Sequence, residues 1–179
     1  MANFVTVASR MIDREVGRWD NFFYPSTDDV TRYYNGSGSE TQYIDEFVSI
    51  TSVSVSEQGG LASTDYTAWG SSDYITEPYN TTPIYKLTVD ILNGSKSLFD
   101  GYKKAVKVVG IAGYSTTPPD LIAQACKIQA VRWFMRAKGG YQDVSGSEEQ
   151  GRRYYKGTTE LDADVRAMLW GYKLELGDR

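Results

Sequence analysis

The chain has 179 residues, enough for one domain with a substantial core, and its formal net charge is −4. Aromatic residues make up 13% of it, which excludes a disordered tail, and no apolar run has the length of a membrane span, so we expect no membrane association. It has no histidine, which excludes Ser-His-Asp and Cys-His catalysis and histidine-dependent zinc sites. Its one cysteine, Cys126, excludes an internal disulfide. A site built from carboxylates stays open.

Residues 4–19 have the spacing of an amphipathic helix. Its apolar stripe consists of Phe4, Ala8, Met11, Ile12, Val16 and Trp19. Pro25 and the Ser, Thr and Asp residues around it end the helical pattern. The start of the chain lacks the order of basic region, apolar stretch and cleavage site that defines a signal peptide, so we expect none.

Residues from about 30 to 112 alternate between strand-like runs and turn residues. The runs are rich in Val, Ile, Tyr and Thr, and they read VTRYY, QYIDEF, SVSVS, DYTAW, SDYITEP, IYKLTVDIL and KAVKVVGIAG. Within VSITSVSVSE the alternation shifts at Ser52, between Ile50 and Val53, which predicts a bulge or a short turn. The region is therefore predicted to be a small, mostly antiparallel sheet of short strands.

A strand–turn–helix joint follows the last run. Its glycines lack the spacing of a dinucleotide fingerprint or a phosphate loop, so we interpret it as a structural turn that holds no ligand. The residues assigned to this joint are Gly110, Gly113, Tyr114, Pro118 and Pro119. Thr117 is a candidate cap for the helix that follows, and both prolines fit its first turn.

The helix predicted over residues 118–137 is apolar on most of its circumference. One side carries Ile122, Cys126, Ala130, Trp133 and Ala137, a second side carries Leu121, Ile128, Val131 and Met135, and a narrow polar seam carries Gln129, Arg132 and Arg136. Such a helix is buried on more than one side, so we expect a neighbouring subunit to cover the second. The predicted subunit interface consists of Ile128, Val131, Trp133 and Met135.

The C-terminal part is predicted to be a flexible loop followed by a helical arm. Residues 138–159 contain five glycines and no periodicity. In residues 160–179, with Thr159 or Asp162 as a cap, the apolar stripe is Leu161, Val165, Met168, Leu169, Tyr172 and Leu176. A short helix needs a surface that buries its stripe. Its own domain could supply that surface, but the long tether suggests another molecule. Trp170 lies off the stripe and is either an anchor for that molecule or packed within the chain.

Two further patterns are weak candidates for chemistry or binding. Asp28–Asp29 and Asp45–Glu46 are paired carboxylates, but neighbours in a strand point to opposite faces, so a solvated surface is the favoured interpretation. The stretch EEQGRRYYKG, residues 148–157, mixes basic and aromatic residues as single-stranded nucleic-acid sites do, but a solvated or partner-ordered loop is favoured. We expect no enzyme activity, metal or cofactor.

The charge is unevenly distributed along the chain. Residues 20–100 hold 12 acidic and 3 basic side chains, whereas residues 101–157 hold 10 basic and 4 acidic ones. An acidic middle section is not typical of a protein that grips nucleic acid over its whole face. It fits a protein that must not adhere to nucleic acid passing close by.

The order of these pieces resembles the head–tail adaptor (connector) proteins of tailed bacteriophages. The progression VxVxGxxGY…PPxxIxxAxxxxAxRxxxR is met here by Val106, Val108, Gly110, Gly113, Tyr114, Pro118, Pro119, Ile122, Ala125, Ala130, Arg132 and Arg136. The start, ASRMIDREVGRWDNFFYPS, is similar to the family's first helix and loop, and SITSVSVSEQGGLASTDYTAW and DYITEPYNTTPIYKLTV are similar to its central strands. The likeness covers most of residues 8–137.

The resemblance implies a structural protein of the virion neck, assembled in the host cytoplasm. Its copies would form a dodecameric ring under the portal protein, extend the channel for double-stranded DNA without sequence-specific binding, and offer the lower face to a stopper or tail-completion protein. It implies an α+β fold in which residues 1–137 form the adaptor core, a helical core with an inserted antiparallel sheet. The arm of residues 160–179 would dock on the portal.

Two other classes of protein stay open from the residues alone. One is a carbohydrate- or peptide-binding β module with helical flanks, which the many tyrosines permit. The other is a carboxylate-based hydrolase, which needs two acidic groups about 5–10 Å apart in a cleft.

Overall fold

The computed structural model describes residues 2–59, 65–138 and 160–173, which form two compact units. Residues 1–21 and 118–178 belong to a helical unit, and residues 22–117 belong to a β unit inserted between them. The predicted α+β class and the inserted antiparallel sheet are confirmed.

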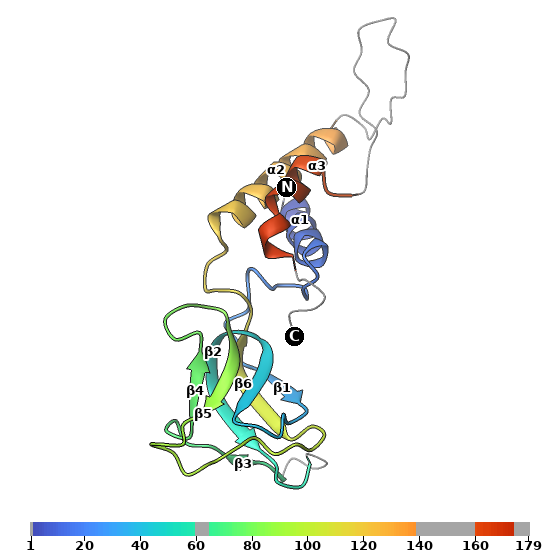
Figure 1. The fold of residues 1–179 in the computed structure, drawn as a ribbon. Coiled ribbons are helices and arrows are strands. Elements are labelled where there is room, and N and C mark those ends of the chain that lie inside the picture. Colours follow the sequence, from blue (N-terminus) through green and yellow to red (C-terminus); the bar gives the residue numbers. More distant parts are fainter. Residues whose placement is uncertain (1, 60–64, 139–159, 174–179) are drawn as a thin grey trace, which may run out of the picture. The chain divides into compact units, whose positions relative to one another are not determined.

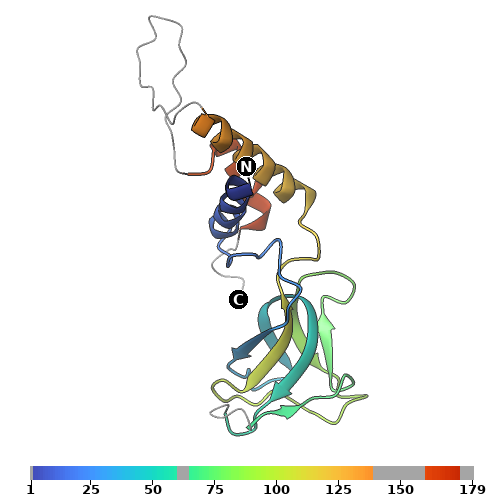
Figure 2. The ribbon, with the colours of Figure 1, turned by 180° about the vertical axis from the view of Figure 1, so that it is seen from behind.

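The helical unit contains α1 (Ala2–Glu15), α2 (Asp120–Lys138), α3 (Ala163–Met168) and the short 3-10 helix η3 (Trp170–Tyr172). Figures 1 and 2 show α1 and α3 lying alongside α2, the longest of the helices. The side of α1 that packs on α2 contains Ala8 and Ile12, both buried, and the Phe4 ring meets the Phe134 ring edge-on with 6.3 Å between centroids. Within the described ranges, no helix combines the length and the apolarity needed to cross a membrane.

Helix α1 ends earlier than the predicted residue 19 because Gly17 turns the chain. Gly17 has a φ of 78°, a left-handed conformation that glycine adopts without a steric penalty. The Gly17 N–H donates to the Arg14 carbonyl and the Arg18 N–H to the Asp13 carbonyl, the paired bonds of a Schellman motif. Val16 is still buried beside the helix, whereas Trp19 lies beyond its end.

Helix α2 begins two residues after the predicted start. The Ala123 N–H donates to the Pro119 carbonyl over 2.9 Å, so Pro119 precedes the first helical residue and Thr117 does not cap the helix. A proline suits this place because its missing N–H would have no partner within the helix.

The β unit is built from β1 (Val30–Tyr34), β2 (Thr41–Val55), β3 (Thr67–Ala68), β4 (Tyr74–Glu77), β5 (Ile84–Val89) and β6 (Val106–Ala112). All pairings are antiparallel, in the order β1-β6-β2-β5-β4, with β3 added to β2. QYIDEF and SVSVS, which the sequence pattern separated, belong to the single strand β2. Its first half pairs with β5 and its second half with β6. The alternating apolar residues build a core that includes Phe47, Val53, Leu87, Val108 and Phe99, and the Phe99 ring stacks on Trp69 at 4.7 Å.

The predicted irregularity near Ser52 is a β-bulge. Ile50 pairs with Gly110 and Ser52 pairs with Val109, so Thr51 is the extra residue. At the bulge the backbones come so close that a Cβ on Gly110 would lie 2.2 Å from the Ser49 carbonyl oxygen. Gly110 is therefore required inside strand β6 by this close approach, and it is not the turn residue that the sequence pattern indicated.

Replacing Gly110 with alanine should destabilise the β unit, because the new methyl group would collide with backbone that cannot move independently. We expect a loss of about 1–3 kcal/mol, measured by urea unfolding. The matched control is Gly70→Ala in the same unit, where the nearest atom to an added Cβ, an Asp73 carboxylate oxygen, is at 3.4 Å. Equal stability of both variants would contradict this account of Gly110.

Candidate functional site

An exposed apolar row runs along the side of α2 that α1 and α3 leave open. Leu121, Val131 and Met135 are 44%, 45% and 59% exposed, and Ile128 is half-buried. These are the residues of the predicted second side. Trp133 was also assigned to the subunit interface, but it is only 9% exposed and belongs to the core of the helical unit. We call Leu121, Ile128, Val131 and Met135 the open row.

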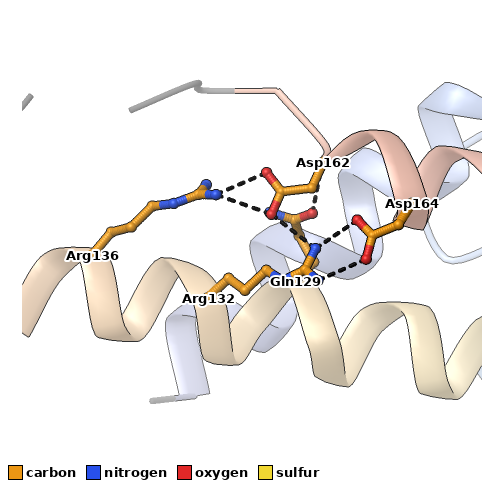
Figure 3. A network of polar contacts seen from close by, with 5 residues as sticks. All are labelled: Gln129, Arg132, Arg136, Asp162 and Asp164. Atoms are coloured by element: carbon orange, nitrogen blue, oxygen red, sulfur yellow. Dashed lines mark hydrogen bonds and ion pairs between the residues drawn. The ribbon is translucent and has the colours of Figure 1, made fainter. Parts of the chain in front are cut away.

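The polar seam of α2 is a docking site for the C-terminal segment (Figure 3). The two terminal nitrogens of Arg132 each lie 2.6 Å from one Asp164 carboxylate oxygen, a bidentate geometry. Arg136 donates to both oxygens of Asp162, over 2.9 and 3.0 Å, and Arg132 adds a bond of 3.1 Å to the same carboxylate. Gln129, fully buried, accepts the Asp162 N–H through Oε1 over 2.9 Å. Two arginines one turn apart thus hold the two aspartates at the start of α3.

Apolar packing completes this docking. Leu161, Val165 and Leu169 are 4%, 0% and 0% exposed, so the inner stripe of the segment is buried in its own unit. The expectation that the stripe needs another molecule is therefore wrong for these three residues. Glu15 of α1 adds an ion pair with Lys173 at 3.0 Å.

Of the predicted arm, residues 160–173 are described by the structure. In the described part of the arm, α3 ends at Met168 and η3 at Tyr172, and Asp162, one of the two cap candidates, occupies the N-cap position without a capping bond from its side chain. Met168 and Tyr172 are half-buried. The loop of residues 139–159, the stretch 148–157 and Leu176 lie outside the described residues.

Acid should weaken the contact between Arg132 and Asp164. The hydrogen bond from Arg132 lowers the pKa of Asp164 to about 2 from 3.8. A carboxyl whose pKa is depressed by folding stabilises the folded state fully above its unfolded pKa, and that contribution is lost as the pH falls toward the folded pKa. The difference in unfolding free energy between the parent chain and Asp164→Asn should therefore be constant above about pH 5 and shrink as the pH falls toward about 2, as measured by urea titrations. A difference that grows on acidification would contradict the role given to Arg132. Asp164 is 57% exposed, so the effect is modest.

Trp170 stands out on the surface of the same segment. It is 77% exposed, and its ring has the Lys173 ammonium 6.0 Å from its centroid. Its exposure contradicts packing against the described residues of the helical unit, which was one of the two alternatives for Trp170. A large exposed aromatic side chain next to a firmly docked segment has the properties of an interface anchor.

The residues of the predicted joint have structural contacts. A Cβ on Gly113, whose φ is 153°, would meet Pro25 Cβ at 2.8 Å, so glycine is needed there. The Tyr114 ring lies 5.9 Å from the Phe22 ring and 5.5 Å from the Phe23 ring, and the Tyr114 N–H donates to the Phe22 carbonyl.

Three of the four paired carboxylates have defined surroundings in the structure. Asp45 forms an ion pair with Arg32 at 3.0 Å and accepts a hydrogen bond from the Tyr34 hydroxyl, whose pKa is raised mainly by burial. Glu46 is 6% exposed, which corrects the expectation of a solvated surface for that pair. Asp28 accepts a hydrogen bond from Ser26 in an exposed turn. In the part of the chain that the structure describes, no group of three or more Cys, Asp or Glu residues could hold a metal ion.

The arginine–aspartate docking was not anticipated from the sequence. Its signals are Arg132 and Arg136 at i, i+4 on α2, and Asp162 and Asp164 two residues apart further along the chain. Both signals are visible in the sequence, but their pairing across residues 139–159 is not.

No protein-family model matches the sequence, and no curated protein matches it. The architecture does match solved structures: a fold with helices from the two ends of the chain, and an antiparallel sheet inserted between them in the sequence, is found in neck structures of gene transfer agent (GTA) particles. One is a chain in the neck of an empty GTA particle computed with C6 symmetry, with a TM-score of 0.53, 12% identity, and coverage of 99% of this chain and 80% of that one. Another is a chain in the neck of a native GTA particle computed with C12 symmetry, with a TM-score of 0.53, 12% identity, and coverage of 99% and 84%. At this identity the likeness shows a shared fold.

Proposed function

We propose that the chain is a head–tail adaptor of a phage-like particle. Its copies form a ring under the portal, extend the DNA channel, and present the opposite side to a stopper or tail-completion protein. The observation that carries this proposal is the fold shared, over 99% of the chain, with chains of two GTA necks. The order of motifs that resembles phage head–tail adaptors supports it independently.

The ring interface is assigned to the open row. Exposed Val131 and Met135 lie on α2, whose opposite side is already covered by α1 and whose polar seam is occupied by the α3 segment. The open row is thus the part of the helix that remains for a second copy. The C12 symmetry of one similar neck agrees with a dodecameric ring as the proposed assembly.

The portal contact is assigned to the exposed part of the C-terminal segment, with Trp170 as its anchor and Met168 and Tyr172 beside it. Leu161, Val165 and Leu169 are buried, so in this state they hold the segment on α2. In this proposal the docked segment presents Trp170 as part of a rigid surface, which lowers the entropy lost on binding.

The test is co-sedimentation of the purified chain with capsids that carry a portal and with capsids that lack one. The proposal predicts binding only when the portal is present, and a loss of binding for Trp170→Ala. Binding to neither kind of capsid, or to both equally, would refute an adaptor role. Sugar or peptide binding by a strictly monomeric chain would instead favour a binding module.

A further inference from the structure

The β unit carries a group of basic and aromatic side chains that the adaptor role does not by itself explain. The Lys104 ammonium lies 4.5 Å from the centroid of the Tyr33 ring, and the Lys107 ammonium lies 5.8 Å from that of the Tyr66 ring. The two rings are 5.7 Å apart, so the lysines flank a tyrosine pair. We call Tyr33, Tyr66, Lys104 and Lys107 the tyrosine–lysine patch.

Strand pairing and loop contacts bring these residues together. Tyr33 of β1 is the cross-strand partner of Lys107 of β6, so their side chains share one face of the sheet. Lys104 precedes β6 in a turn and has a φ of 54°, a left-handed conformation that is uncommon for a lysine. The Lys104 N–H donates to Asn35 Oδ1 over 3.0 Å, and the Lys104 carbonyl accepts from the Tyr66 hydroxyl over 2.7 Å. Side chains on both sides thus hold this backbone and direct the lysine over Tyr33.

The patch is electrostatically different from the rest of the β unit. Residues 22–117 hold eleven acidic and six basic side chains, and three of the six are Lys103, Lys104 and Lys107. Arg32 and Lys86 are neutralised by Asp45 and Glu77, at 3.0 and 2.6 Å. In the described part of the chain, no carboxylate forms an ion pair with the three clustered lysines, although Asp65 acts on Tyr66 from the neighbouring position. Within this acidic unit, the three lysines thus form a local cluster of positive charge.

We propose that the tyrosine–lysine patch binds the phosphate backbone of duplex DNA. Lysines act on phosphates as point charges without reading sequence, and the Tyr33 and Tyr66 rings keep the two ammonium groups apart on one face. A few such contacts in an acidic surround give weak, salt-sensitive binding that lets the duplex slide. This choice of ligand rests on the proposed adaptor function, because the channel is where DNA would meet the β unit.

The experiment measures binding of the purified chain to a short, fluorescently labelled DNA duplex by anisotropy, over a series of salt concentrations. The test variant is Lys104→Gln/Lys107→Gln, which removes both charges and keeps the side-chain length. The matched control is Lys96→Gln/Lys127→Gln, which changes the net charge equally at two lysines that are not part of the patch. A second variant, Lys104→Arg/Lys107→Arg, retains both charges.

We expect the test variant to lose on the order of tenfold in affinity at about 50 mM salt, and its plot of log affinity against log salt to become shallower by about 2. The control and the arginine variant should bind as the parent chain does. Equal affinities and slopes for test and control variants, or no binding by the parent chain at low salt, would overturn the proposal. Binding of an acidic protein by the patch, with duplex binding unchanged in the test variant, would overturn it too.

This outcome is separable from the fate of the adaptor proposal. The anisotropy assay needs neither a portal nor a ring, whereas the capsid assay does not involve the patch. A chain that binds portal-bearing capsids but shows no difference between test and control variants refutes the patch alone. A chain that fails on capsids but shows the expected salt slopes keeps the patch and loses the adaptor.

Discussion

Leu169→Asp should detach the C-terminal segment from α2. Leu169 is fully buried, and an aspartate there would lose the apolar contacts and place a charge among apolar groups. We expect the helical unit to lose at least about 3 kcal/mol of unfolding free energy. Hydrogen exchange should show loss of protection across residues 161–169, including the Asp162 amide that donates to Gln129, while the β unit stays protected.

The adjacent residue provides the control for this experiment. Trp170 is 77% exposed, so Trp170→Asp should leave the stability of the helical unit within about 0.5 kcal/mol of the parent chain. The two variants also separate holding the segment on α2, the role of Leu169, from contacting the portal, the role proposed for Trp170. Trp170→Asp should abolish portal binding while the helical unit stays folded. If Leu169→Asp is as stable as the parent chain, the segment is a free arm, as the sequence alone suggested.

Val131→Asp and Met135→Asp should prevent ring formation and leave the fold intact. Both side chains are exposed in the single chain, so a carboxylate there stays hydrated and the melting temperature should change little. In a ring the same carboxylate would be buried without a partner, which costs several kcal/mol at each subunit contact. The mass of assemblies in solution should therefore fall to that of the single chain.

Lys127→Asp is the matched control for these ring variants. Lys127 is an exposed residue of the same helix that is not part of the open row, so this variant should assemble as the parent chain does. Normal assembly of both Val131→Asp and Met135→Asp would show that the open row is not the interface.

Amphipathic patterning predicted which side chains are buried but not which surface buries them. The stripe containing Leu161, Val165 and Leu169 was recognised, yet its partner was sought in another molecule. Hydrophobic periodicity indicates only that one side of a helix is buried, and it does not identify the surface that buries it. The partner lies in the same helical unit, and the α2 residues that hold the segment, Arg132 and Arg136, are separated from it in the sequence by residues 139–159, so no local pattern could connect the two.

Alternation along strands was more informative than the identity of single glycines. The shift at Ser52 predicted the bulge, because the two-residue period fixes which face each side chain occupies. Gly110 was assigned to a turn, since a glycine near a strand end is compatible with either a turn or a close approach of backbones. The tyrosine–lysine patch was not predicted at all, because Tyr33, Tyr66 and Lys104 meet only through strand register and loop contacts.

The measurement that tests the adaptor assignment most directly is the mass of the complex between the purified chain and a purified portal ring, by native mass spectrometry. The account predicts that one portal ring takes up a full ring of this chain, adding about twelve times its 20.0 kDa mass. The same experiment with Met135→Asp should show no complete ring. Association of single copies without ring closure, or no association with the portal, would contradict the account.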